Sequence, residues 1–309
     1  MAVGLCTYKR PDGLRRVIRH IGISARSLEQ PAHLIVVDND GADDAIKSIA
    51  EEAAAAAGLK LHFIVEPKPG ISAARNAIFA CAESIGVDLV AMIDDDEWPS
   101  EAWLTELLRQ REATGAVVVG GPVQPVFPDH KKNLERVARW WSVQPQFLHG
   151  RPFVFCTCNF LIDMRAIRDF PRPLFDDSFG LSGGGDTVFF RRLFHADHAM
   201  AWAERALVYE DVPESRASLK WMRTRRFRVG NHAVSWEALD HGRLQTLGKT
   251  LALTARLGVY PLFGREPEAP FTGWLLEMDK IRGRWDAHTG SLYMEYNRPD
   301  AIGHEKACR

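Results

Sequence analysis

Short apolar segments alternate with stretches of helical spacing through the first 120 residues of this chain. Strands are predicted at Val3–Thr7, Leu34–Val37, Leu59–Val65, Leu89–Ile93 and Ala116–Val119. Helices are predicted between them, at Gly13–Ser27, Asp43–Ala57, Ser72–Ser84 and Ser100–Thr114. Because each crossover helix returns the chain to the same end of a sheet, this order favours parallel βαβ units. We therefore expect an α/β fold with a Rossmann-like, mostly parallel sheet flanked by helices.

The alternation stops after Pro122. An irregular, proline-containing region follows, in which short strands are expected at Val154–Leu161, Met200–Ala203 and Ala206–Tyr209. Further on the spacing predicts helices at Ser215–Leu239, Leu244–Leu257 and Thr272–Ala287. We accordingly expect an α/β domain over residues 1–230 and a C-terminal helical extension over residues 231–309.

Composition excludes several classes of protein. The chain has 39 Lys and Arg against 40 Asp and Glu, so it offers no overall attraction to nucleic acid, and no nucleic-acid partner is expected. Five scattered cysteines are too few for a disulfide framework, which favours a reducing, cytoplasmic compartment. Without a stretch of about 20 apolar residues, we expect a protein that is soluble or at most peripheral on a membrane.

Polar side chains follow the predicted strands at the ends where ligands of parallel sheets bind. Thr7 and Tyr8 end the first strand, and Asp38 follows the second. Arg75 lies in the first turn of the helix that follows Gly70, where free amides and a guanidinium form an anion site. An ordinary surface arginine is the alternative for Arg75. Asp38 suits a hydrogen bond from a ribose or a base, although nicotinamide-binding folds also place an acid there.

The run Asp94–Glu97 places four acids in succession behind an apolar strand. Such acids repel one another unless a cation neutralises them. Hard carboxylate oxygens suit Mg²⁺ or Mn²⁺, which would share its remaining coordination positions with a diphosphate. The alternative is a solvated acidic turn that precedes the next helix, where acids favour the helix dipole.

Each of two later segments allows a functional and a structural interpretation. In the glycine-rich segment 182–190, Asp186 opens a helix, either as a functional acid or as a simple helix cap. Six cations and no acid occupy Arg216–Arg228, which suits phosphate or anionic lipid, or else a solvated basic face.

Five segments in this order resemble glycosyltransferase family 2, whose members are inverting nucleotide-sugar enzymes with a GT-A fold. They are VGLCTYKRP, VVDND, GISAARNA, IDDDEWP and GGGDTVFFRRL, and the match extends over roughly residues 3–230. The segment VYEDVPESRASLKWMRTRRFRVGN is similar to the bacterial exopolysaccharide, succinoglycan-type branch.

The resemblance implies a role for each matching position. Thr7, Tyr8 and Asp38 would hold the nucleoside, with Arg75 beside the nucleotide. Asp94 and Asp95 would belong to the donor site, and Asp96 would be the metal ligand that ends the DxD signature. Asp186 would be the catalytic base, and Arg226 would face the diphosphate. The chain departs from the family pattern at Gly185, where the family usually has Glu, and at Lys9, where Asn is commoner.

The implied reaction is metal-dependent, inverting transfer of a sugar from a nucleotide-diphosphate donor, with a UDP-sugar expected. The expected acceptor is a hydroxyl of a saccharide or a polyprenyl-linked saccharide, in surface polysaccharide assembly at the cytoplasmic membrane face. The basic run and the helices after it predict peripheral contact with an anionic membrane surface. The alternative is that these helices only pack on the α/β domain.

Three other functions share parts of this sequence pattern. A sugar-phosphate nucleotidyltransferase would normally have a glycine-rich loop after its first strand, where this chain has TYKRPDG. A nicotinamide dehydrogenase needs GxGxxG there, and the sequence lacks it. A non-catalytic sugar-binding subunit of a membrane assembly stays open because of Gly185.

Overall fold

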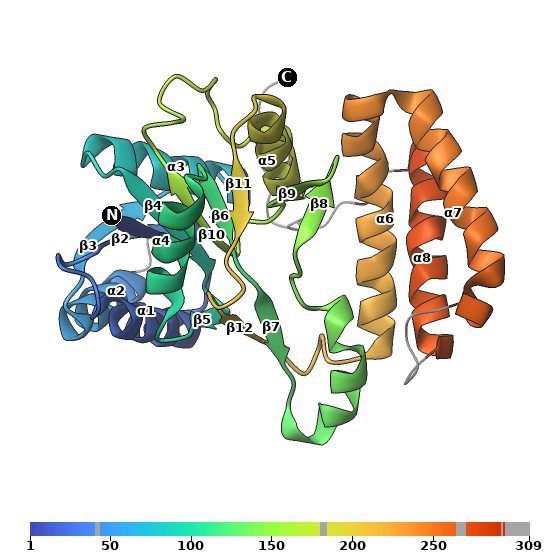
Figure 1. The fold of residues 1–309 in the computed structure, drawn as a ribbon. Coiled ribbons are helices and arrows are strands. Elements are labelled where there is room, and N and C mark those ends of the chain that lie inside the picture. The colour runs from blue at the N-terminus through green and yellow to red at the C-terminus, as the bar shows by residue number, and fades with distance from the viewer. Residues whose placement is uncertain (41–43, 180–183, 264–269, 292, 294–309) are drawn as a thin grey trace, which may run out of the picture.

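The α/β part has the alternation that the sequence predicts (Figure 1). The computed structural model describes the chain except residues 41–43, 180–183, 264–269, 292 and 294–309. Its first elements are β1 (Ala2–Thr7), α1 (Pro11–Ala25), β2 (His33–Asp38), α2 (Asp44–Ala57), β3 (Lys60–Val65), α3 (Ile71–Ser84), β4 (Leu89–Asp94), β5 (Glu97–Pro99), α4 (Trp103–Thr114) and β6 (Val118–Gly120). The α/β class is thereby confirmed.

Seven strands form the central sheet in the order β11-β6-β10-β4-β1-β2-β3. β10 (Asn159–Asp163) and β11 (Met200–Trp202) come from the irregular half of the chain. β10 runs antiparallel to both neighbours, β4 and β6, whereas the other pairs are parallel. The sheet is therefore mostly parallel, with one reversed strand inserted near its middle.

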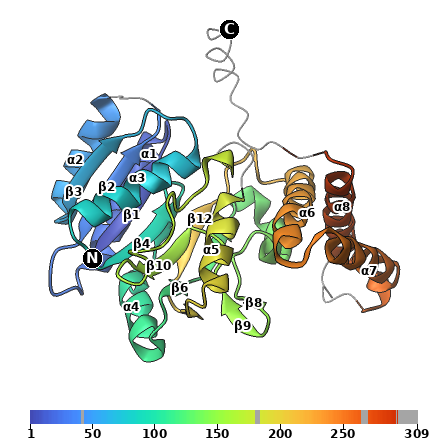
Figure 2. The ribbon, with the colours of Figure 1, turned by 90° about the horizontal axis from the view of Figure 1, so that it is seen from above.

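Alternate residues of each buried strand pack on opposite faces of the sheet, because side chains along a strand point to alternate sides. Leu34 and Val36 belong to the core with α1, α2 and α4, whereas Ile35 and Val37 belong to the core with α3 and α5 (Gly185–His195). Helices thus cover both faces, as Figure 2 shows from above. The continuous apolar runs follow from burial on both sides.

A second, smaller sheet lies beside the first. Its order is β5-β12-β7, with β7 at Val123–Val126 and β12 at Val208–Asp211. The 3-10 helix η1 (Asp129–Trp140), the hairpin of β8 (Gln146–Leu148) and β9 (Arg151–Phe153), and the short η2 (Asp177–Phe179) complete the irregular region. The strand expected at Val154–Leu161 begins only at Asn159 in the structure.

Three long helices form a layer beside the α/β part: α6 (Leu219–His241), α7 (Arg243–Phe263) and α8 (Pro270–His288) (Figure 1). α6 and α8 touch through their backbones. A Cβ on Gly230 would lie 1.8 Å from the Lys280 carbonyl oxygen, and one on Gly283 would lie 2.0 Å from that of Phe227. Only glycine fits at either position. Residue 230, where the sequence suggested a boundary, lies in the middle of α6.

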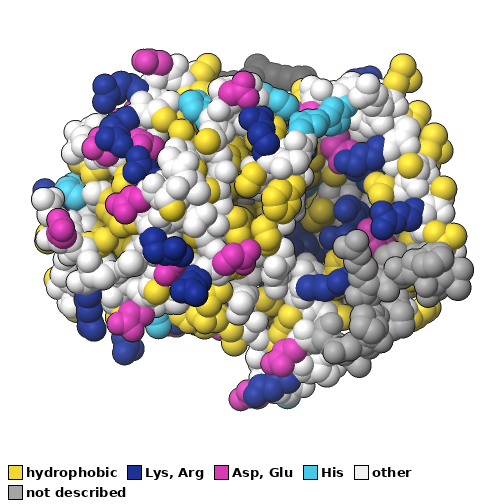
Figure 3. Space-filling view, in the orientation of Figure 1, with side chains coloured by type: hydrophobic (Ala, Val, Ile, Leu, Met, Phe, Trp, Pro, Cys, Tyr) yellow, Lys and Arg dark blue, Asp and Glu magenta, His cyan; other side chains and the backbone are white. Residues whose placement is uncertain are grey.

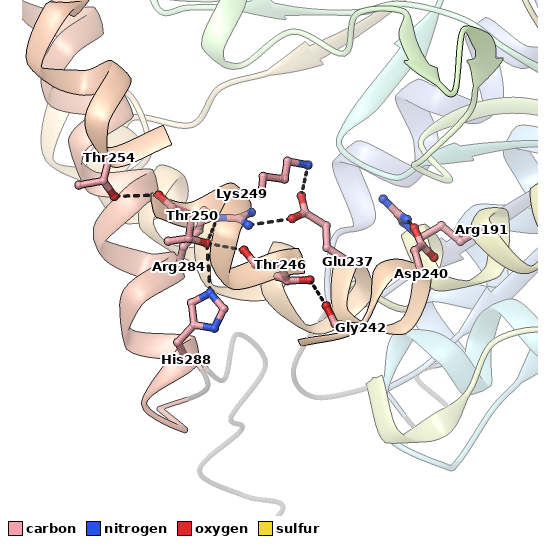
Figure 4. A network of polar contacts seen from close by, with 10 residues as sticks. All are labelled: Arg191, Glu237, Asp240, Gly242, Thr246, Lys249, Thr250, Thr254, Arg284 and His288. Atoms are coloured by element: carbon pink, nitrogen blue, oxygen red, sulfur yellow. Dashed lines mark hydrogen bonds and ion pairs between the residues drawn. The ribbon is translucent and has the colours of Figure 1, made fainter. Parts of the chain in front are cut away.

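A buried polar network joins the three helices (Figure 4). The Arg284 guanidinium donates to Glu237 Oε2 at 2.7 Å and to Thr250 Oγ1 at 2.9 Å, and Lys249 Nζ donates to Glu237 Oε1 at 2.7 Å. An ion pair between Arg191 and Asp240 connects α5 to α6. The helical layer is therefore fixed both internally and to the α/β part. Within the part of the chain that the structure describes, no helix combines the length and apolar character needed to cross a bilayer.

Candidate functional site

The ends of three parallel strands meet at one edge of the central sheet. Thr7 of β1 is in register with Asp38 of β2, and Cys6 is in register with Asp94 of β4. Parallel strands end together, so these side chains are neighbours although they are far apart in the sequence. The expectation that Thr7, Asp38 and Asp94 share an edge is confirmed.

Asp95 is held by the segment that follows β1. The Thr7 hydroxyl donates to Asp95 Oδ2 at 2.9 Å, and the Tyr8 backbone N–H donates to the same oxygen at 3.4 Å. Arg10 Nη1 donates to Asp95 Oδ1 at 2.9 Å and lies 2.7 Å from Asp96 Oδ2. One arginine therefore bridges two neighbouring aspartates of the acidic run.

A second cation reaches the acidic run from the other side. Arg216 Nη1 lies 3.6 Å from Asp96 Oδ2 and 3.9 Å from Glu210 Oε1 of β12. Arg16 of α1 pairs with Asp211 and donates to the Asp96 carbonyl at 3.3 Å. The small sheet brings Glu210 to the site, because β12 pairs with β5, which continues directly from the acidic run.

Burial and repulsion between neighbouring carboxylates raise the pKa of several of these acids. Burial raises the pKa of Asp94 to about 7, opposed by Arg75 and assisted by Asp96 and Asp95. Burial raises the pKa of Glu97 well above its ordinary value, with Asp94 adding to the effect. Burial also raises the pKa of Glu210, while Arg225 and Arg216 oppose the shift. A bound cation would favour the ionised form of these carboxyls and lower their pKa values.

The donor set at this edge suits a hard divalent cation. Its ligands would be carboxylate oxygens, which Mg²⁺ and Mn²⁺ prefer. Among the described residues no three metal-ligating side chains already converge on one point. A diphosphate and water would therefore complete the coordination. Asp96 is the more accessible of the two arginine-bound aspartates, with a side chain 23% exposed against 10% for Asp95.

Asp38 offers an acceptor next to this charge cluster. Its side chain is fully buried, Oδ1 accepts from the Asp40 backbone N–H at 3.0 Å, and Oδ2 has no hydrogen-bond partner within the described part of the chain. Asn39 fixes the turn, since Oδ1 accepts from Gly70 N at 3.0 Å and Nδ2 donates to Glu66 O at 2.9 Å. A buried carboxylate oxygen without a partner is unfavourable, and a nucleoside O–H or N–H would satisfy it.

Arg75 lies on α3, close enough to the acids of this edge to act on Asp94. Its charge opposes the upward pKa shifts of Asp94 and of Cys6, and its guanidinium carbon lies 5.7 Å from the centroid of the Phe175 ring. Asn76 fixes that ring through two hydrogen bonds to the Phe175 backbone, at 2.8 and 3.0 Å. The helix start thus presents a cation towards the acids, and its role in binding an anion stays a prediction.

Asp186 opens α5, whose aromatic face packs on the sheet through Phe189 and Phe190. Its Oδ1 accepts from the Thr187 backbone N–H at 2.8 Å. The Thr187 hydroxyl donates to the Phe155 carbonyl at 3.0 Å, and the segment after Phe155 leads into β10 beside β4. The start of α5 is therefore tied to the segment that enters the sheet next to the acids. Part of the glycine-rich loop, residues 180–183, lies outside the described residues.

The basic run divides between two locations. Arg226 forms an ion pair with Glu277 of α8, and its guanidinium carbon lies 4.5 Å from the centroid of the Trp140 ring. Arg216, at the start of the run, faces Asp96 instead. Arg10 is a residue of the site that the sequence did not indicate, whereas Glu97 and Arg216 belong to the acidic and basic runs but had no individual role assigned to them. The position of Arg10 just beyond β1 was the available signal.

A hollow separates the α/β part from the helical layer, and Lys and Arg side chains lie along it (Figure 3). A mostly parallel sheet with acids clustered at the carboxyl ends of its strands is the architecture of a GT-A glycosyltransferase. The fold is similar to mannosyltransferase PcManGT from Pyrobaculum calidifontis in complex with GDP-Man and Mn²⁺, with a TM-score of 0.57, 16% identity and coverage of 93% of this chain and 86% of that one.

A second solved structure supports the same fold. The chain matches S. aureus TarS 1–349 with a TM-score of 0.52 and 12% identity, over 96% of this chain and 97% of that one. It covers 59% of the longer TarS structure. The expected GT-A fold with a helical C-terminal region is thus confirmed.

The chain belongs to glycosyl transferase family 2, whose family model matches residues 2–170. It is 35% identical over 244 residues to succinoglycan biosynthesis protein ExoM of Rhizobium meliloti, covering 78% of this chain and 74% of ExoM. Glycosyltransferase AglE of Haloferax volcanii is 23% identical over 264 residues, covering 84% of this chain and 81% of AglE. The resemblance expected from the five segments is confirmed.

Proposed function

We propose that this glycosyltransferase moves a sugar from a nucleotide-diphosphate donor to a hydroxyl of a saccharide or polyprenyl-linked saccharide, with inversion, in surface polysaccharide assembly. The observation that carries the proposal is the meeting of Thr7, Asp38 and Asp94–Glu97 at one sheet edge. The similarity to ExoM supports an exopolysaccharide product. A UDP-sugar remains the expected donor, with GDP-Man, bound by a structural neighbour, as the alternative.

Donor binding is assigned to groups at the ends of β1 and β2 and at the start of α3. Asp38 accepts a hydrogen bond from the nucleoside, and Thr7 and Tyr8 border it while they hold Asp95 in place. Arg75 attracts the diphosphate from the start of α3. The positions of these groups around one edge support a nucleotide rather than a neutral ligand.

Asp96 is proposed to hold Mg²⁺ or Mn²⁺, with Asp94 and Asp95 completing the acidic run beside it. When bound, the ion neutralises negative charge on the departing nucleoside diphosphate. Arg10 and Arg216, which already lie at Asp96, are placed to add positive charge on the same side. Arg226 could join them only after its ion pair with Glu277 opens.

Asp186 is proposed as the base that takes the proton from the acceptor hydroxyl as that oxygen attacks the anomeric carbon. General-base help of this kind contributes roughly 10²–10⁴-fold. A single displacement inverts the anomeric configuration. Because Gly185 lacks a side chain, a contact that the family's Glu would make to the acceptor falls to another residue.

A cytoplasmic, peripheral position on the membrane follows from the proposed lipid-linked acceptor. α7 supports it, because this helix contains no acid and has Arg243 and Arg256 in addition to Lys249, which pairs with Glu237. The same helix exposes Leu244 and Leu251, 85% and 53% accessible. Basic and apolar groups on one outer helix are the combination that binds the interface of an anionic bilayer.

The proposal is tested with wild type, Asp96→Ala and Asp186→Asn, each assayed with a panel of UDP-sugars and GDP-Man. Asp96→Ala should lose the Mn²⁺-dependent rise in melting temperature that donor binding gives the wild type. Asp186→Asn should keep that rise and lose at least 100-fold in turnover. Asp129→Ala and Asp197→Asn, both at exposed acids outside the site, serve as matched controls. Normal metal-dependent binding by Asp96→Ala, or normal turnover by Asp186→Asn, would contradict the assignment.

A further inference from the structure

A cavity of about 430 Å³ opens between α6 and α8, and none of the acids of the sheet edge is among its lining residues. Three cations line it: Lys220 and Arg223 from the first two turns of α6, and Arg282 from α8. Leu219 and Phe227 supply apolar wall, and Asp279 is the acid among the lining residues. The proposed transfer reaction uses none of these groups.

The charges around the cavity do not balance. Asp279 accepts two hydrogen bonds from Arg223, at 2.7 and 3.2 Å, so this pair is neutral and fixed in place. Lys220 and Arg282 have no acidic partner within 4 Å among the described residues. Two positive charges around this cavity therefore lack a counter-charge within the described part of the chain. The rest of its lining includes one neutral ion pair and two apolar side chains.

The surroundings of Arg282 and Lys220 hold or favour positive charge at the cavity. The Arg282 guanidinium carbon lies 5.4 Å from the centroid of the Phe227 ring, a separation at which the ring attracts the cation. Lys220 extends from a helix whose first turn contains no acid. The α6 dipole therefore adds to the positive potential that an anion in the cavity would meet.

We propose that this cavity binds the phosphate group of a phosphate ester. The phosphate lies between Lys220 and Arg282, and the organic part of the ester contacts Leu219 and Phe227. Arg282 suits phosphate oxygens because its planar fork donates two parallel hydrogen bonds. The ester is either a small soluble molecule or the headgroup of a membrane lipid. This assignment is independent of the transfer reaction.

The test uses the full chain and the variant Lys220→Gln/Arg282→Gln. The matched control is Lys47→Gln/Lys60→Gln, which removes the same charge from exposed positions on α2 and β3. Flotation measures binding to phosphatidylcholine vesicles with and without phosphatidylglycerol. Calorimetry with glycerol 3-phosphate measures binding of a soluble ester.

If the cavity holds a lipid headgroup, the variant loses about tenfold in affinity for phosphatidylglycerol vesicles, the control does not, and glycerol 3-phosphate binds neither. If the ester is soluble, calorimetry detects binding to wild type and control that the variant lacks. Equal binding by variant and control in both arms, or no binding by wild type in either, overturns the assignment. The donor-induced melting shift should be unchanged in the variant. Its loss would show a defect in the transferase site, separate from the cavity.

Discussion

Replacement of Glu237 by Gln should destabilise the helical layer strongly, because it leaves a buried arginine without its counter-charge. The Arg284 side chain is 1% exposed and that of Glu237 is 9% exposed. Glu237 accepts from Arg284 with one carboxylate oxygen and from Lys249 with the other, both at 2.7 Å (Figure 4). Removing one partner of a buried ion pair typically costs about 3–5 kcal/mol. We expect that range for Glu237→Gln.

Urea denaturation followed by circular dichroism measures the effect, with Glu51→Gln on the surface of α2 as a control for loss of a glutamate charge. The double variant Glu237→Leu/Arg284→Met should recover most of the loss, since it removes both charges together. A cost below about 1 kcal/mol for Glu237→Gln would refute the reasoning, because the buried arginine would then be satisfied without Glu237.

The same network makes a pH-dependent contribution of known sign. Burial opposes ionisation of Glu237, but hydrogen bonds from Arg284 and Lys249 outweigh it and lower the pKa of this carboxyl. The stabilisation is therefore complete above the unfolded pKa of about 4.3 and is lost as pH falls through the folded value. Glu237→Gln should remove this part of the acid sensitivity, which urea titrations at several pH values would show.

Three further outcomes follow from the structure. Gly283→Ala should destabilise α6–α8 packing by about 3 kcal/mol or more, since its Cβ would lie 2.0 Å from the Phe227 carbonyl oxygen. The control Gly248→Ala, in open space, should have little effect. Equal melting temperatures of the two variants would contradict the packing. Hydrogen bonds from Arg165, opposed by burial and assisted by Arg111, lower the pKa of Asp163, so Asp163→Asn should cost about 2 kcal/mol at pH 7 and less as pH falls below 4. A cost independent of pH would argue against that charge pairing. Leu244→Ser/Leu251→Ser on α7 should weaken co-sedimentation with anionic liposomes, while the same change at exposed Phe147 should not; unchanged pelleting of the α7 variant would leave α7 without a membrane role.

The sequence predicted the features that depend on local pattern. Buried strands and their helices alternate along the chain, so β1 to β4 could be predicted from the sequence. The meeting of Thr7, Asp38 and Asp94 at one edge could be predicted as well, because parallel strands end together. β5 was missed because its first residue, Glu97, ends an acidic run that resembles a solvated turn. Only its pairing with β12 makes Glu97 part of a buried strand.

Features that depend on partners distant in sequence were not accessible. The reversed direction of β10 is set by insertion between β4 and β6, which no local pattern encodes. In the basic run, helical spacing does not reveal which neighbour each arginine meets. Arg226 lies against Glu277 and Arg216 against Asp96 because η1 and α8 pack on one side of the run and the acids lie on the other.

The sheet order has a consequence for folding during synthesis, because strands late in the sequence pair with early ones. The family-matched segment ends at residue 170, yet β11 and β12 lie beyond it, and β12 joins β5 to β7. A nascent chain stopped there would leave strand edges unpaired and Asp96 without Arg216, conditions that favour aggregation over folding. Pairing these late strands with early ones closes long loops and raises the contact order, which slows folding. The segment that the family model matches therefore lacks two strands of the folded sheets.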